Sequence, residues 1–135
     1  MNRFPVNVRF PIHWGDMDAF GHVNNTRYFA WFETARIAYF QEVGVASKNP
    51  KVAPILARAT CDFRRPLTFP GEVVASARVS KIGTTSFTME YQITLADDPE
   101  NAAAKGEGVI VMYDYDSALK VAIPDELRAA IERVG

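Results

Sequence analysis

The sequence is poor in the residues on which several classes of protein depend. It has one cysteine, Cys61, so no disulfide can form within the chain, and a reducing, cytoplasmic compartment is expected. Its 15 basic and 16 acidic residues give a net charge of −1, without the basic surplus of a nucleic-acid-binding protein. Arg3, Arg9 and Asp16 interrupt the first apolar residues, so neither a signal peptide nor a membrane span is predicted there. We expect neither nucleic acid nor a membrane as a partner.

What is present suffices for a single folded unit. The 135 residues are 48% hydrophobic and 12% aromatic, enough to bury a core without cross-links. The length and the absence of linkers or repeats predict one domain over residues 1–135.

Alternating apolar and polar residues predict five strands. In the first, residues 4–14, Val6 to Ile12 alternate between two faces, and Pro5 and Pro11 place it at an edge or at the start of a sheet. The other predicted strands are residues 55–69, 72–83, 85–97 and 102–116, separated by turn residues. In the third of these four, every second residue from Phe87 to Leu95 is apolar, which predicts one packed face and one wet face.

One long helix is predicted between the first two strands. Asn24 or Asn25 can cap its start and Gly44 can close its end. Its apolar residues cover most of the circumference, which favours a buried helix, and Glu33 and Arg36 are expected to pair on its less buried side. Residues 123–135 predict a short terminal helix, with Pro124 in its first turn.

These elements predict an α+β fold in which a five-stranded antiparallel sheet wraps around one long central helix. A single helix covers only part of such a sheet. The remaining edge and apolar surface favour a homodimer or homotetramer.

Chemically versatile side chains gather in "HWGDMDAFGHVNNTRY", residues 13–28. Together with "FETAR", residues 32–36, this stretch resembles the signature of hotdog-fold thioesterases, in particular 4-hydroxybenzoyl-CoA thioesterase and related acyl-CoA thioesterases. The likeness covers nearly the whole chain.

The resemblance implies hydrolysis of an acyl-CoA thioester at a dimer interface. The family's catalytic carboxylate matches Asp18, and the helix amide that polarises the thioester carbonyl falls at Asn25, where many relatives carry Tyr or His. The segment also resembles plant acyl-carrier-protein thioesterases, in which residues matching Asp18 and His22 are both implicated in catalysis. Phe20 stands where that lineage has an Asn, so its full triad is not preserved.

The chemistry agrees with this assignment. A carboxylate can attack a thioester or activate a water that does, and unpaired N–H groups at a helix start can stabilise the developing oxyanion. Other roles remain open for the same residues. Asp18 could cap a turn, His22 could bond the backbone, and Asn25 could be a cap, while Asp16 is expected to hold loop amides. Glu33 is a reserve candidate for the base.

A phosphate-binding segment and the absence of a metal are also predicted. Coenzyme A is part of the substrate here, so no separate cofactor is expected. Lys81, Thr84, Thr85 and Ser86, around a glycine turn, match the family's nucleotide-binding turn, and Arg64 and Arg65 are alternatives. The residues between His13 and His22 lack zinc-site spacing, so no metal is expected.

The alternative to an enzyme is a non-catalytic module that binds acyl-CoA or acyl-carrier protein. The acid at position 18 argues against it, because mere binding has no chemical need for a carboxylate there. The sequence does not define the acyl group.

Overall fold

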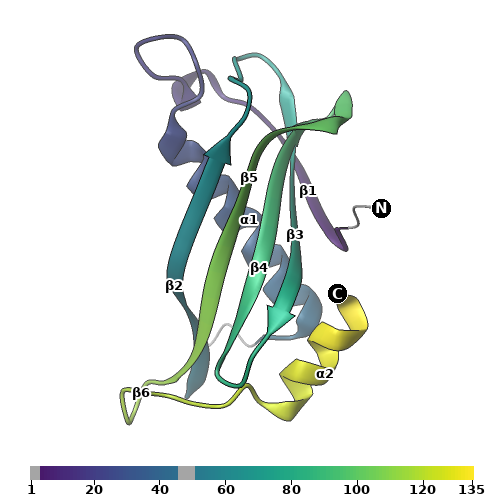
Figure 1. The fold of residues 1–135 in the computed structure, drawn as a ribbon. Coiled ribbons are helices and arrows are strands. Elements are labelled where there is room, and N and C mark those ends of the chain that lie inside the picture. The colour runs from purple at the N-terminus through teal and green to yellow at the C-terminus, as the bar shows by residue number, and fades with distance from the viewer. Residues whose placement is uncertain (1–3, 46–50) are drawn as a thin grey trace.

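A computed structural model of the chain, which describes residues 4–45 and 51–135, shows one antiparallel sheet (Figure 1). Its strands lie in the order β1-β3-β4-β5-β2, and a short β6 pairs with the end of β5. The strand bounds are Val6–Pro11 for β1, Val52–Phe63 for β2, Glu72–Ile82 for β3, Ser86–Leu95 for β4, Asp98–Asp114 for β5 and Leu119–Lys120 for β6. The predicted edge position of the first strand is confirmed.

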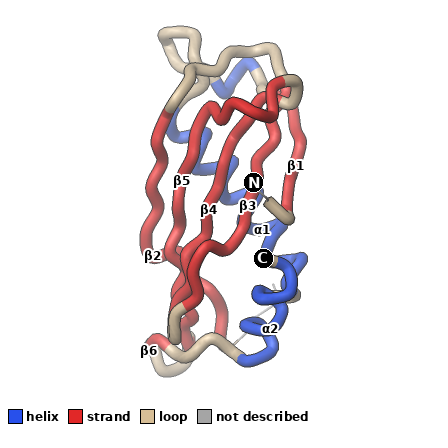
Figure 2. Tube along the Cα trace, turned by 45° about the vertical axis from the view of Figure 1, so that its right-hand side comes forward, coloured by secondary structure: helices blue, strands red, loops and turns tan. Residues whose placement is uncertain are grey.

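Helix α1 (Asn25–Val43) lies along one face of the sheet (Figure 1 and Figure 2). Helix α2 (Asp125–Val134) contacts α1 at the end of the molecule that is lowest in Figure 1. A single turn of 3-10 helix, η1 (Trp14–Asp16), links β1 to the loop before α1. This sheet around a long helix is the predicted hotdog architecture. No helix in the described part of the chain is long and apolar enough to cross a membrane.

Both ends of α1 are set by local chemistry. The Asn24 side chain accepts a hydrogen bond from the backbone N–H of Thr26, which makes Asn24 the N-cap. Gly44 adopts a left-handed conformation with φ of 82° and donates its N–H to the carbonyls of Gln41 and Phe40. The predicted bounds of the helix are confirmed.

Two glycines of β5 leave room for side chains of α1 and β4 to pack closely over the β5 backbone. A Cβ at Gly106 would overlap the Phe32 ring and the Thr60 carbonyl, and a Cβ at Gly108 would lie 2.6 Å from the Tyr91 hydroxyl. The rings of Phe32 and Tyr91 stack with their centroids 5.0 Å apart. Helix, central strands and β5 therefore meet in one continuous core.

The structure corrects four details of the strand prediction. β2 ends at Phe63, and residues 64–71 form a loop, because Arg64 and Arg65 both donate their N–H to the Ala103 carbonyl and the chain then turns away. β5 begins at Asp98, inside the predicted turn, and β6 was not predicted. In β4 the expected inward face is buried from Phe87 to Ile93 and Leu95 is half-buried, but Thr94 on the other face is 3% exposed, where the β4–β5 register shifts.

The prediction that α1 is buried on most sides is wrong in part. Its sheet-facing residues are buried, whereas Phe29 and Ile37 are 37% and 47% exposed. Arg36 lies on the buried side, contrary to expectation, with Nη2 3.8 Å from Oε2 of Glu33. Pro124 is the N-cap of α2 and precedes its first turn.

Candidate active site

A cleft of about 380 Å³ opens beside the first turn of α1. We call it the Asp18 cleft. It lies between the loop before the helix and the loop after β2. The residues that line it are Asp18, His22, Val23, Asn25, Tyr28, Phe63, Arg64, Arg65 and Pro66. The structure thus brings the three residues predicted to be catalytic into one cleft.

A tight backbone loop holds the Asp18 carboxylate at the rim of this cleft. Oδ1 accepts the backbone N–H of Phe20 at 2.9 Å and that of His22 at 3.4 Å. The Asp18 N–H donates to the His22 carbonyl, and Gly21, with φ of 81°, supplies the left-handed turn between them. Both bonds engage one oxygen, and Oδ2 accepts no hydrogen bond from the described residues.

The first turn of α1 leaves one amide without an acceptor. The Asn24 side chain accepts the N–H of Thr26 at 3.0 Å, and the Asn24 carbonyl accepts the N–H of Arg27 at 2.9 Å. The Asn25 N–H has no intrahelical acceptor because of its position, and none of the described residues outside the helix accepts it. A cleft-lining donor at the positive end of the helix dipole therefore lies beside Asp18.

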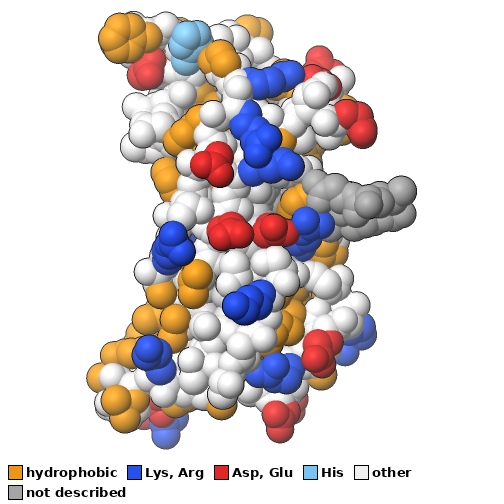
Figure 3. All heavy atoms as spheres, in the orientation of Figure 1, with side chains coloured by type: hydrophobic (Ala, Val, Ile, Leu, Met, Phe, Trp, Pro, Cys, Tyr) orange, Lys and Arg blue, Asp and Glu red, His pale blue; other side chains and the backbone are white. Residues whose placement is uncertain are grey.

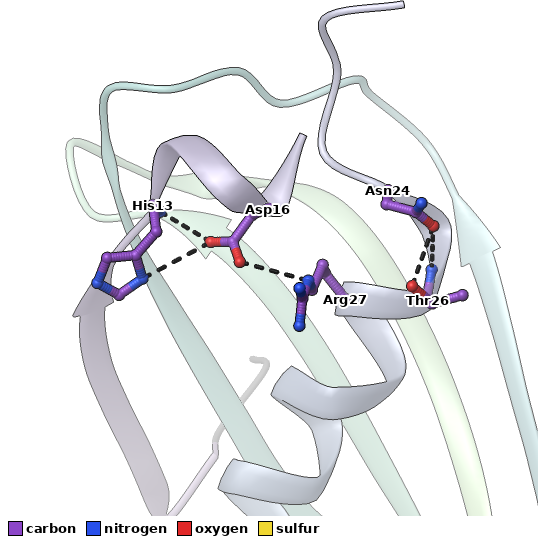
Figure 4. A network of polar contacts seen from close by, with 5 residues as sticks. All are labelled: His13, Asp16, Asn24, Thr26 and Arg27. Carbon is purple, nitrogen blue, oxygen red and sulfur yellow. Dashed lines mark hydrogen bonds and ion pairs between the residues drawn. The ribbon is translucent and has the colours of Figure 1, made fainter. Parts of the chain in front are cut away.

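Asp16 organises the loop through the polar contacts drawn in Figure 4. It does not line the cleft. Its Oδ2 accepts the backbone N–H of His13 at 2.7 Å, and its Oδ1 lies 3.4 Å from Nε of Arg27 on α1. The Asp16 carbonyl also accepts the N–H of Asn24. These contacts confirm that Asp16 holds loop amides, and they fix the loop to the helix start.

Aromatic side chains form one wall of the cleft. The rings of Tyr28 and Phe63 meet edge to face with centroids 5.1 Å apart. Burial, with a smaller contribution from the nearby Cys61, raises the pKa of Tyr28 to about 12. Burial likewise raises the pKa of the Cys61 thiol to about 11, helped by Asp62, so this thiol is protonated at neutral pH and is a poor nucleophile.

Sequence reasoning did not assign Tyr28 and Phe63 to the site. Tyr28 follows Asn25 by one helical turn, which is a signal that could have placed it on the same side of the helix. Phe63 comes from a strand distant in sequence, and only the tertiary fold brings it to the cleft.

The predicted phosphate-binding residues do not lie together. Arg64 and Arg65 line the Asp18 cleft, and Arg65 is paired with Asp98 at 3.0 Å. The turn 81–86 joins β3 to β4 at the opposite end of the sheet (Figure 1). β3 spans Glu72 to Ile82, about 33 Å at ~3.3 Å per residue, which separates this turn from the cleft of the same chain.

Glu33, the reserve candidate for the base, does not line the cleft either. Its side chain is 66% exposed, on the side of α1 away from the core. It cannot reach the Asp18 cleft without a change in the helix.

A larger hollow of about 550 Å³ lies on the outer face of the sheet, which Figure 3 shows as a mixture of acidic and basic side chains. Its charged residues balance, with Asp62, Glu90 and Glu107 against Arg64, Arg78 and Lys105. It contains neither a helix start nor the Asp18 loop, so its size does not make it the better candidate. No three His, Cys, Asp or Glu residues gather into a possible metal site within residues 4–45 and 51–135.

Comparisons with known proteins agree with the fold. Residues 12–131 match the family described as the thioesterase-like superfamily. The protein PA5185 of Pseudomonas aeruginosa is 31% identical, with a TM-score of 0.88 over 97% of this chain and 92% of that one. A thioesterase from Thermus thermophilus, complexed with coenzyme A and Zn, is 32% identical, with a TM-score of 0.82 over 96% of this chain and 98% of that one.

A curated relative carries a named activity. The 1,4-dihydroxy-2-naphthoyl-CoA hydrolase of Nostoc punctiforme is 34% identical over 79 residues, which are 58% of this chain and 51% of that protein. The fold and the family match together define the class of protein, a thioester hydrolase with the hotdog fold. The chain belongs to the thioesterase-like superfamily.

Proposed function

We propose that this protein hydrolyses acyl-CoA thioesters in the Asp18 cleft, releasing a carboxylic acid and free coenzyme A. The observation that carries the proposal is the pairing of a fixed carboxylate with an amide that lacks an acceptor. Asp18 and Asn25 line the same cleft. The neighbouring amides already have acceptors, because the Phe20 N–H bonds to Asp18 and the Thr26 N–H bonds to the N-cap Asn24.

The chemistry needs only these two groups near the thioester. The carbonyl oxygen accepts the Asn25 N–H, so the charge that develops in the transition state lies at a helix N-terminus. Asp18 either attacks the carbonyl carbon through Oδ2 or takes a proton from an attacking water. The coenzyme A thiolate then leaves, and hydrolysis of any acyl-enzyme regenerates the carboxylate.

His22 has a supporting part in this proposal. It lines the cleft, and its backbone N–H and carbonyl both bond to Asp18. We propose that its imidazole orients the water or donates to the carbonyl. Tyr28 and Phe63, whose rings meet edge to face, offer an apolar wall for the acyl group.

We propose that the turn 81–86 binds the phosphates of coenzyme A. Because this turn lies far from the cleft of its own chain, it must then come from a second copy of the chain. β2 is the sheet edge beside the cleft, and beyond Pro54 its residues 55–63 contain no proline; at the other edge, Pro11 is the last residue of β1. Antiparallel pairing of two β2 edges around a two-fold axis brings the turn 81–86 of one copy to the end of the assembly that holds the other's cleft. We therefore propose a homodimer with Lys81, Thr84, Thr85 and Ser86 as phosphate ligands.

The relatives support coenzyme A as the thiol carrier. The Thermus thermophilus thioesterase binds coenzyme A, and the Nostoc punctiforme relative is named as a hydrolase of an aromatic acyl-CoA. The aromatic wall of the cleft makes aryl-CoA thioesters the first substrates to test.

The experiment is free-thiol release from a panel of aryl-, short-chain and long-chain acyl-CoAs. It compares the wild type with Asp18→Asn and with Asp97→Asn, an exposed carboxylate in the β4–β5 turn. The amide of Asn keeps an oxygen for the Phe20 N–H, so the loop stays closed while the base is lost. We expect Asp18→Asn to lower kcat about 1000-fold, within the range for loss of a general base, and Asp97→Asn to change nothing.

Full activity in Asp18→Asn would refute the assignment of Asp18. Tight binding of acyl-CoA without turnover by the wild type would favour the alternative of a binding module. Faster turnover of acyl-carrier-protein thioesters than of acyl-CoAs would contradict coenzyme A as the carrier.

A further inference from the structure

The side chain of Arg128, in α2, reaches the turn 81–86, and helix and turn lie at the same end of the molecule (Figure 1). Its Nη2 donates a hydrogen bond to the Gly83 carbonyl at 2.6 Å. Arg128 is half-buried, and none of the described carboxylates lies within 4 Å of its guanidinium. Its charge-assisted bond is therefore made to the turn and not to an acidic partner.

Four successive carbonyls of the turn, those of residues 83–86, each accept a hydrogen bond. The donors are Nη2 of Arg128 for Gly83, and the backbone N–H groups of Ile123 for Thr84, Met112 for Thr85 and Gly83 for Ser86. The backbone N–H groups of Thr84 and Thr85, by contrast, have no acceptor among the described residues. The acceptors of this turn are used and two of its donors are free, which suits the binding of an anion.

The planar peptide bond determines where these two free amides point. In a trans peptide, the carbonyl and the N–H of the next residue point in opposite directions. The carbonyls of Gly83 and Thr84 point toward Arg128 and Ile123, which belong to α2 and to the segment just before it. The N–H groups of Thr84 and Thr85 therefore both point away from α2. Two successive amides on one side of a turn form an anion-binding concavity.

We propose that Arg128 is a positioning residue for the phosphates of coenzyme A. It holds the peptide between Gly83 and Thr84 so that the amides of Thr84 and Thr85 face the ligand, while the guanidinium itself lies behind the turn. This inference rests on the phosphate site of the proposed function and adds the residue that shapes it. Without the guanidinium, the Gly83 carbonyl is free to rotate toward solvent, and the Thr84 N–H rotates with it. The turn then presents an acceptor where a phosphate needs a donor.

Calorimetry with the adenosine bisphosphate fragment of coenzyme A tests this role without any need for turnover. We expect Arg128→Met to weaken binding of the fragment at least about tenfold, which is the value of one hydrogen bond to a charged group. Arg128→Lys should recover most of this loss, because its ammonium can donate to the same carbonyl. Arg133→Met is the matched control, because it removes the same charge from an exposed position in the last turn of α2 and should leave binding unchanged.

Kinetics separate phosphate binding from the chemical step. An acyl-CoA and the matching acyl-pantetheine carry the same thioester, but the pantetheine compound has no phosphate. Arg128→Met should raise KM for the acyl-CoA at least about tenfold and keep kcat within about twofold, as for loss of binding that is equal in the ground and transition states. Both constants for the acyl-pantetheine should stay as in the wild type. A variant that merely disturbed the fold would lose activity on both substrates.

A measurement on the wild type covers the case in which Arg128→Met fails to fold. Titration with the adenosine bisphosphate fragment should shift the NMR resonances of the Thr84 and Thr85 amide protons downfield, because both amides gain an acceptor.

Contrary outcomes separate this inference from the proposed function. Unchanged fragment binding in Arg128→Met, equal weakening in Arg133→Met, or unshifted amides in the turn would overturn the role of Arg128 and leave the hydrolase intact. So would an equal rise in KM for the acyl-CoA and the acyl-pantetheine. A wild type that binds the fragment with the expected amide shifts but releases no thiol would overturn the proposed function and leave the role of Arg128 supported. A wild type that hydrolyses acyl-CoA without binding the fragment would overturn the phosphate site and the role of Arg128 together, but not that of Asp18.

Discussion

Oδ1 of Asp16 lies 3.4 Å from Nε of Arg27, while Oδ2 of the same carboxylate accepts the backbone N–H of His13 at 2.7 Å. One buried acid thus joins the end of β1, the η1 turn and the first turn of α1. The loop that carries Asp18 begins immediately after it. The orientation of the candidate catalytic carboxylate therefore depends on a neighbour that does not touch substrate.

Asp16→Ala should destabilise the protein and impair catalysis together. Removing a largely buried carboxylate that accepts charge-assisted bonds costs about 1.5–3 kcal/mol, and the Asp18 loop loses its attachment to the helix. Urea unfolding measures the first effect and kcat the second. Arg27→Met is the matched control, because it removes only the half-exposed partner and should cost less than about 1 kcal/mol. Equal losses in both variants would contradict the central place of Asp16.

Gly106→Ala should be among the most destabilising small changes in the chain. A methyl group there overlaps the Phe32 ring and the Thr60 carbonyl, so α1 must move away from β5. We expect a loss of about 1–3 kcal/mol in the free energy of unfolding, as for overpacked cores. Gly15→Ala provides the control, because a Cβ at Gly15 meets nothing within 4 Å. An unchanged free energy of unfolding in Gly106→Ala would show that helix and sheet are less closely packed than described.

The buried tyrosines predict a loss of stability at high pH. Burial raises the pKa of Tyr39 to about 12 from the ordinary 10.0. Between about pH 10 and 12 the unfolded chain releases this proton while the folded chain retains it, so the free energy of unfolding falls as the pH rises. Tyr39→Phe removes the group and should flatten this fall in urea unfolding series at pH 9–11. An unchanged pH dependence in the variant would show that Tyr39 ionises equally well in both states.

Much of this architecture could be predicted from residues that act locally. Asn24 and Gly44 define the ends of α1 because capping depends on the cap residue and its immediate neighbours. The inward face from Phe87 to Ile93 follows from strand periodicity alone. Asp18, His22 and Asn25 reach one cleft because a short loop leads directly into the helix.

Tertiary packing decided the features that were missed. Helical spacing predicts that Arg36 lies near Glu33, but it does not show that Arg36 is buried, which depends on Tyr91 from a distant strand. Arg64 and Arg65 continue the sequence pattern of β2, yet both donate their backbone N–H to the Ala103 carbonyl, and the strand ends there. The distance from Asp18 to the turn 81–86 depends on strand order, which no local pattern encodes.

The amide of Asn25 permits the most direct test of the proposed mechanism. Proline is well tolerated at the first position of a helix, and Asn24 already has the extended backbone, with φ of −62° and ψ of 138°, that a following proline requires. Asn25→Pro therefore deletes one N–H with little other disturbance, and Asn25→Ala retains that N–H while removing the side chain.

The decisive measurement is kcat for the best acyl-CoA substrate in these two variants. We predict that Asn25→Pro lowers kcat about 100- to 1000-fold, as for loss of one oxyanion donor, and that Asn25→Ala stays within about threefold of the wild type. Equal activity in Asn25→Pro and Asn25→Ala would contradict the assignment of the oxyanion to the start of α1.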